Sequence, residues 1–288
     1  MDEEVLAGNN ATFEFGESVA ANRFWDRNPT FWPAFERLLA VTNKAFGREW
    51  RATNRMEDVG FNLGETCRRE FLEIAFLAVN GHGVAAQKLL RGLYERAVTL
   101  EYIRRTPDKA ERFVRFGAIQ EYKVLKRALE LVGQEEFDKH MGTQLAVYQK
   151  MYDEVRPEFQ VTDCKKCNTK QIAFSWDVDF ASMVRSLGGP YQSLYMASYA
   201  LPNLHVHATA TSAFAHEPNF GTPEEKNIDE AEVSLIHATL ILILVLNSQS
   251  EIFSLGLDAE TKACWDDVTT VWKDRPHGPT GRRAARQC

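Results

Sequence analysis

The clearest pattern of apolar and polar positions runs from Gly83 to Arg105. At about 100° per residue, its apolar side chains gather on one broad arc of a helical wheel: Ala86, Leu89, Leu90, Leu93, Tyr94, Ala97 and Leu100. Val98 and Tyr102 extend this surface, so only a narrow stripe remains for water. A helix with so wide an apolar surface needs neighbours on more than one side. The pattern therefore predicts a central helix.

Apolar positions at helical spacing predict helices along most of the remaining chain. The predicted helices span 30–46, 64–80, 83–105, 107–133, 134–155, 177–187, 190–201, 228–255 and 258–273. The short connection at 80–83 predicts an antiparallel hairpin, which places Cys67, Glu70 and Glu73 near the later part of the central helix. Residues 156–176 break the helical pattern, which predicts a loop in which a short hairpin can form. The fold class is all-α, a bundle of about eight or nine helices with little or no sheet.

The same pattern sets the predicted domain limits. Residues 1–22 lack apolar periodicity and are expected to be a flexible segment, and residues 273–288 to be a disordered basic tail. A single helical domain is expected over residues 23–272.

Composition and charge narrow the classes of protein. The chain has 288 residues, 44% apolar, and a formal charge of −6, which argues against general nucleic-acid binding through phosphate neutralisation. Its N-terminus lacks the pattern of a signal peptide, and the apolar run at 235–246 is too short to cross a membrane. Five cysteines, odd in number and mostly isolated, do not form a disulfide framework. We expect a cytoplasmic protein with no membrane partner.

Arg91 and Glu95 are the most suggestive polar pair. They lie four residues apart on the predicted central helix, at the edge of its apolar arc and beside Tyr102. One interpretation is a helix-surface ion pair that contributes about 0.3–0.5 kcal/mol. The other is a charged pair that lines a cleft or a partner surface.

His205 and His207 lie two residues apart and suggest a metal site. On a strand they share one face, whereas on a helix they diverge by about 200° and cannot hold one ion. The surrounding chain is helical, so we expect a helix from Pro202 or Asn203 with one histidine inward. A core histidine with a backbone partner remains an equal alternative.

Cys164 and Cys167 form a C-x-x-C in a polar loop and are weak candidates for zinc. A complete site needs two further ligands, and no second C-x-x-C is present, so exposed thiols are the default. The chain also lacks the phosphate-loop, dinucleotide, H-E-x-x-H and G-x-S-x-G motifs. No cofactor is therefore expected.

Four segments carry a resemblance to a known family: LLRGLYERAVTLEYI, PDKAERFVRFGAIQEYKVL, FSWD and SLYMASYALPNLHVHATA. Over about residues 60–250 the chain resembles a bacterial family of helical proteins of uncharacterised function, with Arg91, Glu95 and His207 at the matching positions. It is distantly similar to HEPN-type helical bundles, many of which are metal-independent ribonucleases of toxin and defence systems. Their hallmark is an arginine four to six residues before a histidine. Here Asn203 stands four before His207, which weakens the nuclease interpretation.

Three functions follow as expectations. The leading one is an intracellular interaction or ligand-binding module of a bacterial stress or defence system, with a protein or small molecule as partner. The first alternative is an HEPN-like ribonuclease acting on RNA, with His205 or His207 as acid/base and Arg91 or Arg115 at the phosphate. The second is a metal-dependent hydrolase that uses His205 and His207. Expected site residues are His207, His205, Arg91 and Glu95, with Tyr102, Arg115 and Tyr199 in binding; a homodimer is left open.

Overall fold

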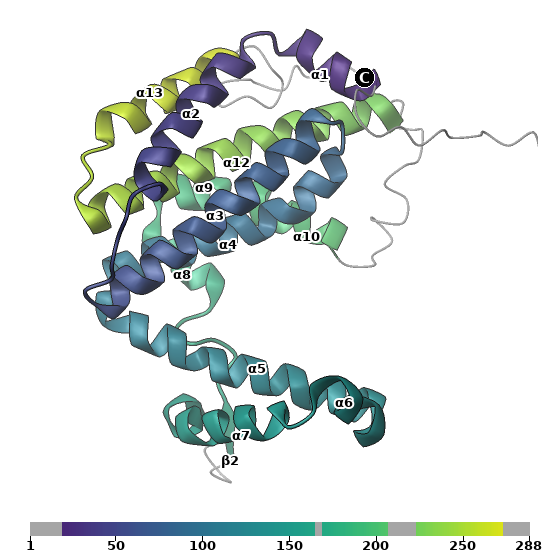
Figure 1. The fold of residues 1–288 in the computed structure, drawn as a ribbon, viewed down its shortest axis with the longest axis vertical. Helices are drawn as coiled ribbons and strands as arrows, with labels where there is room; N and C mark the ends of the chain where they lie inside the picture. Colours follow the sequence, from purple (N-terminus) through teal and green to yellow (C-terminus); the bar gives the residue numbers. More distant parts are fainter. Residues whose placement is uncertain (1–18, 165–168, 207–222, 273–288) are drawn as a thin grey trace, which may run out of the picture.

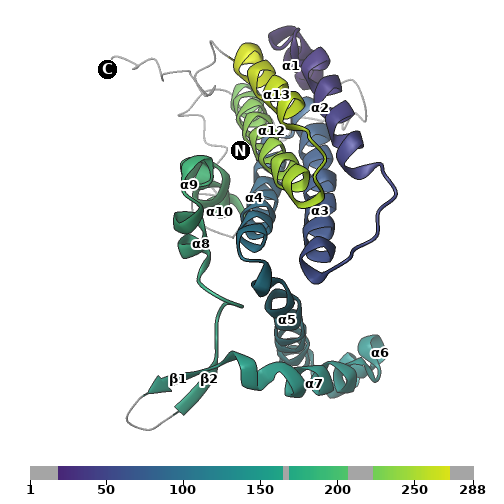
Figure 2. The same ribbon diagram turned by 90° about the vertical axis from the view of Figure 1, so that its left-hand side faces the viewer.

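A computed structural model describes residues 19–164, 169–206 and 223–272, although for residues 20, 163, 164, 169 and 223–228 it describes the backbone alone. These residues form a layered helical body and a projecting arm (Figures 1 and 2). The body contains α1 (Val19–Arg27), α2 (Phe31–Phe46), α3 (Arg55–Val79), α4 (Gly83–Arg105), α8 (Phe180–Leu187), α9 (Gly189–Tyr195), the π-helix η4 (Met196–Ala200), α10 (Leu201–Val206), α12 (Pro223–Phe253) and α13 (Asp258–Val271). The arm contains the short helix η2 (Pro107–Lys109), α5 (Ala110–Val132), α6 (Gln134–Met141), α7 (Gln144–Val155), η3 (Arg156–Phe159), and strands β1 (Gln160–Cys164) and β2 (Thr169–Ile172).

The all-α class is confirmed, but the described part of the chain holds more helices than the eight or nine predicted. One reason is Gly142, whose φ of 52° is incompatible with a continuous helix. The helix predicted over 134–155 is therefore wrong and divides into α6 and α7. Helix α1 also begins at Val19, inside the segment predicted to be flexible.

Helix α3 begins at Arg55, nine residues before the predicted start at Gly64. The Asn54 side chain accepts a hydrogen bond from the Glu57 backbone N–H at 2.9 Å, and the Glu57 carboxylate accepts one from the Thr53 backbone N–H at 2.8 Å. This reciprocal capping satisfies donors that a helix start leaves free. The polar residues at 53–57 therefore cap the helix, and the predicted start at Gly64 was wrong.

Helix α4 is the central helix that the apolar pattern predicts. It packs against α3, α12, α8 and α10, and its residues Leu90, Leu93, Tyr94 and Leu100 are fully buried. The predicted antiparallel hairpin with α3 is also confirmed: Cys67 lies against the Leu93 carbonyl, and Glu70 forms an ion pair with Arg96 at 2.7 Å. The arrangement leaves one side of α4 facing α8–α10 (Figure 2).

Helix α12 fills the centre of the bundle. By length and composition its segment Asp229–Phe253 could cross a membrane, but 83% of its most apolar window is buried inside the protein. It approaches α3 closely at Gly60 and Gly64, and Gln249 donates a hydrogen bond to the Gly60 carbonyl at 2.7 Å. The absence of side chains at these two glycines permits the close approach.

A buried carboxylate ties three elements together. Glu101 on α4 accepts hydrogen bonds from Arg104 and Arg105, both at 2.7 Å, and from Ser248 on α12 at 2.9 Å. Arg105 also donates to the Leu187 carbonyl of α8. Burial opposes ionisation of Glu101, but the two arginines and Ser248 outweigh it and lower the pKa of this carboxyl group.

The arm leaves the body along α5 and returns along α7 (Figure 1). The rings of Tyr122 and Tyr152 stack with centroids 4.4 Å apart, and Arg115 pairs with Glu158 at 2.5 Å. Strands β1 and β2 form an antiparallel hairpin beyond α7, as the sequence allowed.

Candidate functional site

The π-helix η4 interrupts the helical run between α9 and α10. The Leu201 backbone N–H donates to the Met196 carbonyl, five residues earlier. Pro202 explains the change, because it has no N–H for the Ser198 carbonyl and its ring clashes with that turn of an α-helix. Short π-helices are rare and occur frequently at functional sites. This one places Tyr199 against α4.

Arg91 and Tyr199 form the centre of the candidate site. The Arg91 guanidinium lies 5.0 Å from the Tyr199 ring centroid, and its Nη2 pairs with Glu95 Oε1 at 3.0 Å. Burial opposes the charge on Arg91, but Tyr199 and Glu95 outweigh it and raise the pKa of the guanidinium. Arg91 is therefore a permanent, partly desolvated cation held over an aromatic face.

An aromatic cluster holds Tyr199 in place. Its ring centroid lies 4.6 Å from that of Phe180 and 5.2 Å from that of Tyr195. Tyr94 lies behind it and donates a hydrogen bond to the Tyr191 carbonyl at 2.6 Å. Burial raises the pKa of the Tyr94 phenol, so this hydroxyl stays protonated.

Three polar atoms beside this cluster are buried and make no hydrogen bond within the described residues: Arg91 Nε, Ser198 Oγ and Asn203 Oδ1. They come from α4, η4 and α10, which pack together. A buried polar group without a partner costs about 1–3 kcal/mol. The junction therefore has unused hydrogen-bonding groups, as do the buried side chains of Arg48, Glu70 and Gln249 elsewhere in the described residues.

Apolar side chains are also exposed on the two helices that carry Tyr199 and Asn203. Met196, Leu201 and Val206 are exposed on η4 and α10. Methionine, aromatic residues and arginine are enriched at protein interfaces. We call Arg91, Tyr199, Met196, Leu201 and Val206 together the Arg91–Tyr199 surface.

The charges next to this surface are mixed, with a negative excess. Glu95 pairs with Arg91 and Glu70 with Arg96, and the charges of Glu73 and Glu95 also act on Glu70. Burial raises the pKa of Glu70 against the opposing effect of Arg96. Such a charge distribution does not favour a polyanion.

The structure brings only part of the predicted site together. Arg91, Glu95 and Tyr199 meet, whereas Tyr102 donates a hydrogen bond to Asp177 at 2.7 Å near the other end of α4 and Arg115 lies on the arm. The binding roles expected of Tyr102 and Arg115 stay predictions, and the structure places both residues away from the Arg91–Tyr199 contact. Arg91 and Tyr102 are eleven residues apart on α4, which corresponds to about 16 Å along the helix.

The histidine and cysteine candidates have different outcomes. His205 is half-buried on α10, which is helical from Leu201 to Val206, so the strand form that a shared metal requires is wrong over 204–206. His207, Cys167 and the Cys164 side chain lie outside the described part. Within that part, no group of three or more His, Cys, Asp or Glu residues is placed to hold a metal ion.

Ser198 and Asn203 were missed in the sequence, although a signal was present. Pro202 follows a helical Tyr- and Ser-rich run, and a proline inside a helix predicts local irregularity. That irregularity could have been placed from the sequence, but the unpaired state of the two side chains depends on their distant neighbours.

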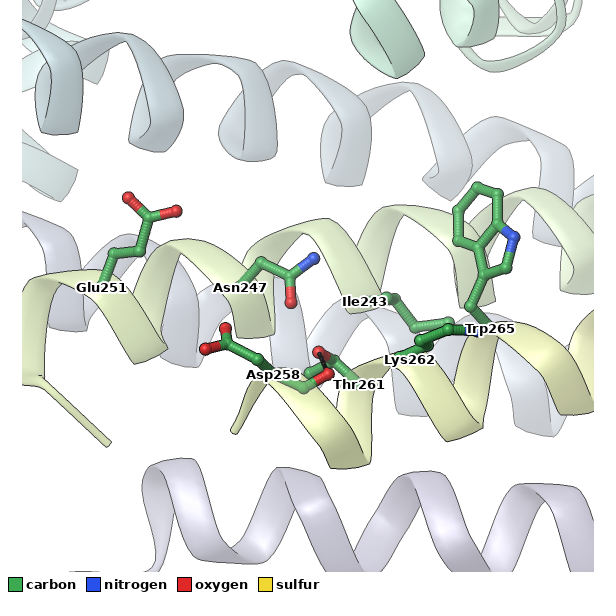
Figure 3. A pocket seen from close by; sticks show the side chains of 7 residues that line it. All are labelled: Ile243, Asn247, Glu251, Asp258, Thr261, Lys262 and Trp265. Atoms are coloured by element: carbon green, nitrogen blue, oxygen red, sulfur yellow. Dashed lines mark hydrogen bonds between the residues drawn. The ribbon is translucent and has the colours of Figure 1, made fainter. Parts of the chain in front are cut away.

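A separate groove of about 380 Å³ lies between α12 and α13 (Figure 3). Its lining consists of Ile243, Asn247, Glu251, Asp258, Thr261, Lys262 and Trp265. Glu251 is paired with Arg104, and Lys262 with Asp266. Exposed and largely paired charges line an open surface here, so the groove is a weaker candidate than the α4–η4–α10 junction.

Comparison with known proteins places the chain in a protein family. A family model described as a family of unknown function (DUF5677) matches residues 59–226, more than half of the chain. The match includes Arg91, Glu95 and Tyr199 and excludes the α12–α13 groove. Neither the curated proteins nor the solved structures include one that matches the chain.

Proposed function

Since the chain belongs to this family of unknown function, its role has to be inferred from its own residues, and we propose that it is a protein-interaction module. The partner docks on the Arg91–Tyr199 surface. The observation that carries the proposal is the Arg91 guanidinium, stacked on Tyr199 with its Nε buried and unpaired within the described residues.

Interface energetics support this assignment. A few residues, often Tyr and Arg, contribute most of the binding energy at protein interfaces, and surrounding apolar contacts exclude water from them. Arg91 and Tyr199 have the residue types of such a centre, and Met196, Leu201 and Val206 those of its surroundings. A partner with an apolar side chain and a hydrogen-bond acceptor would complement the surface, because 25% of the Arg91 side chain stays exposed beside Glu95.

The local charges favour a protein over RNA. Nucleic-acid binding depends on neutralising phosphates with an excess of lysine and arginine. The Glu95 carboxylate already pairs with Arg91, and Glu70 already pairs with Arg96, so neither guanidinium group is a free cation for a phosphate. The ribonuclease alternative rests on His207, outside the described residues, and remains a prediction.

The proposed setting is cytoplasmic and belongs to a bacterial stress or defence response. The resemblance to HEPN-type bundles supports the setting, and the acidic composition is consistent with a soluble partner complex. The recognition of a partner by the Arg91–Tyr199 surface does not depend on this setting.

Site-specific photo-crosslinking tests the proposal. A photoreactive amino acid replaces Met196 in the full chain, and another replaces Phe174, an even more exposed apolar residue that follows β2. The expected result is that one partner is captured from position 196 and not from position 174. The purified partner should bind the wild-type protein and bind the Tyr199→Ala variant more weakly. Equal capture from both positions contradicts the proposal, as does RNA cleavage that requires His207.

A further inference from the structure

The outer side of α5 carries an uncovered stripe with a seven-residue repeat. Three of its apolar members are exposed: Val114 (40%), Val124 (68%) and Leu131 (72%). At Gly117 an added Cβ would meet nothing within 4 Å, so the backbone itself is open to a close neighbour. The complete α5 stripe consists of Val114, Gly117, Glu121, Val124, Ala128 and Leu131.

The stripe is distinct from the face of α5 that α7 covers. Ile119 is buried, and Tyr122 stacks on Tyr152 of α7, about a third of a turn around the helix from the stripe. Helix α7 has its own exposed apolar pair, Val147 and Met151, one turn apart. Helical wheels of the two antiparallel helices put this pair on the same side of the arm as the α5 stripe. The arm therefore presents a two-helix apolar face.

We propose that a second copy of this chain covers the face, with the two α5 helices packed antiparallel about a twofold axis. A seven-residue apolar repeat is the signature of helix pairing. In the register that centres the axis between residues 122 and 123, Val114 meets the partner's Leu131 and Gly117 meets the partner's Ala128. Large residues then face large ones and small face small. The stripe is self-complementary, as a twofold interface requires.

Charge supports the antiparallel direction. Glu121 is the single charged member of the stripe, and within the described residues it forms no ion pair. In the proposed register it packs against the partner's Val124, which follows Lys123 in the chain and lies one helical turn before Arg127. A parallel pairing would instead place the two Glu121 carboxylates together, which is destabilising. Glu121 therefore favours the antiparallel over the parallel pairing of the two α5 helices.

The mass of the full chain in solution tests the dimer. Sedimentation at about 100 µM is expected to give twice the chain mass, because mass action favours association at high concentration. Val124→Glu should weaken dimerisation by at least about 100-fold, since it places each new carboxylate directly against the partner's Glu121. Val124 is exposed in the single chain, so an unchanged melting temperature of the diluted protein verifies folding. Met196→Glu is the matched control and should stay dimeric.

A monomeric wild type, or a dimer that Val124→Glu leaves intact, overturns the proposal. The two variants also distinguish the dimer from the proposed function. Met196→Glu should lose partner binding and stay dimeric, whereas Val124→Glu should bind the partner and become monomeric.

Disulfide trapping tests the register. Gly117→Cys and Ala128→Cys chains are prepared with Cys164, Cys167 and Cys288 changed to serine. A mixture should form the 117–128 disulfide, while each chain alone should not, because like positions lie several helical turns apart in the antiparallel pair. Crosslinking of either chain with itself overturns the antiparallel arrangement.

Discussion

The guanidinium of Arg91 lies 5.0 Å from the ring centroid of Tyr199, a residue 108 positions later in the chain. The contact exists because the π-helix turns Tyr199 toward α4. A cation over an aromatic face is worth about 0.5–1 kcal/mol when exposed and about 2 kcal/mol when desolvated. Arg91 and Tyr199 therefore act as one rigid unit at the proposed interface.

Pro202→Ala tests the origin of the π-helix. Alanine restores the N–H that can donate to the Ser198 carbonyl, so we expect the π-helix to relax toward an α-helix and the free energy of unfolding to rise by about 1–3 kcal/mol. Denaturant unfolding measures the gain. The same change should turn Tyr199 away from Arg91 and weaken partner binding. A variant that is less stable and binds normally would contradict this explanation.

Glu101→Gln tests the buried network at the end of α4. Removing one partner of a buried, hydrogen-bonded ion pair is expected to lower the free energy of unfolding by about 3–5 kcal/mol at neutral pH. Denaturant titration gives the value. Glu251→Gln, which also removes a carboxylate paired with Arg104 but at an exposed position, should change it by less than about 1 kcal/mol.

The pH dependence of stability gives an independent measure of the same network. The pKa of Glu101 is lower in the folded state than its ordinary value of 4.5. A carboxyl group of this kind stabilises the fold above its unfolded pKa, and this stabilisation is lost as the pH falls through the folded pKa. Below about pH 4.5 the wild type should thus lose stability more steeply than Glu101→Gln. If the stability of the wild type and of Glu101→Gln fell equally with pH, the stabilising role of the ionised Glu101 carboxylate would be contradicted.

Gly64→Ala tests the close contact between α3 and α12. An added Cβ would lie 2.4 Å from Gln249 Nε2 and 3.0 Å from the Phe46 ring. We expect the variant to lose about 1–3 kcal/mol of unfolding free energy despite the higher helix propensity of alanine. Asn62→Ala, on the exposed face of the same helix, should change it by no more than about 0.5 kcal/mol. Equal effects would show that the helices do not meet closely at Gly64.

Local pattern was enough to predict the centre of the fold. The apolar arc of 83–105 identified α4 as the central helix, and the short connection at 80–83 identified its hairpin with α3. Both depend on residues close in sequence. The pair Arg91–Glu95 was found for the same reason, since residues four apart on a helix are neighbours.

The rest depended on contacts between distant segments. The predicted helix started only at residue 64, and nothing in the sequence shows that α12 packs against Gly60 and Gly64. Tyr102 was grouped with Arg91 because it follows on the same helix, yet its hydroxyl is held by Asp177, 75 residues away. Ser198 and Asn203 became candidates only once their burial beside α4 was known.

The affinity of the partner captured at position 196 for wild type and for Tyr199→Ala, measured by titration calorimetry, tests the central claim most directly. If the Arg91–Tyr199 unit is the centre of the interface, the substitution should weaken binding by at least about 30-fold, equivalent to about 2 kcal/mol, while Phe174→Ala binds as wild type. Tyr199→Ala binding within twofold of wild type would contradict the claim.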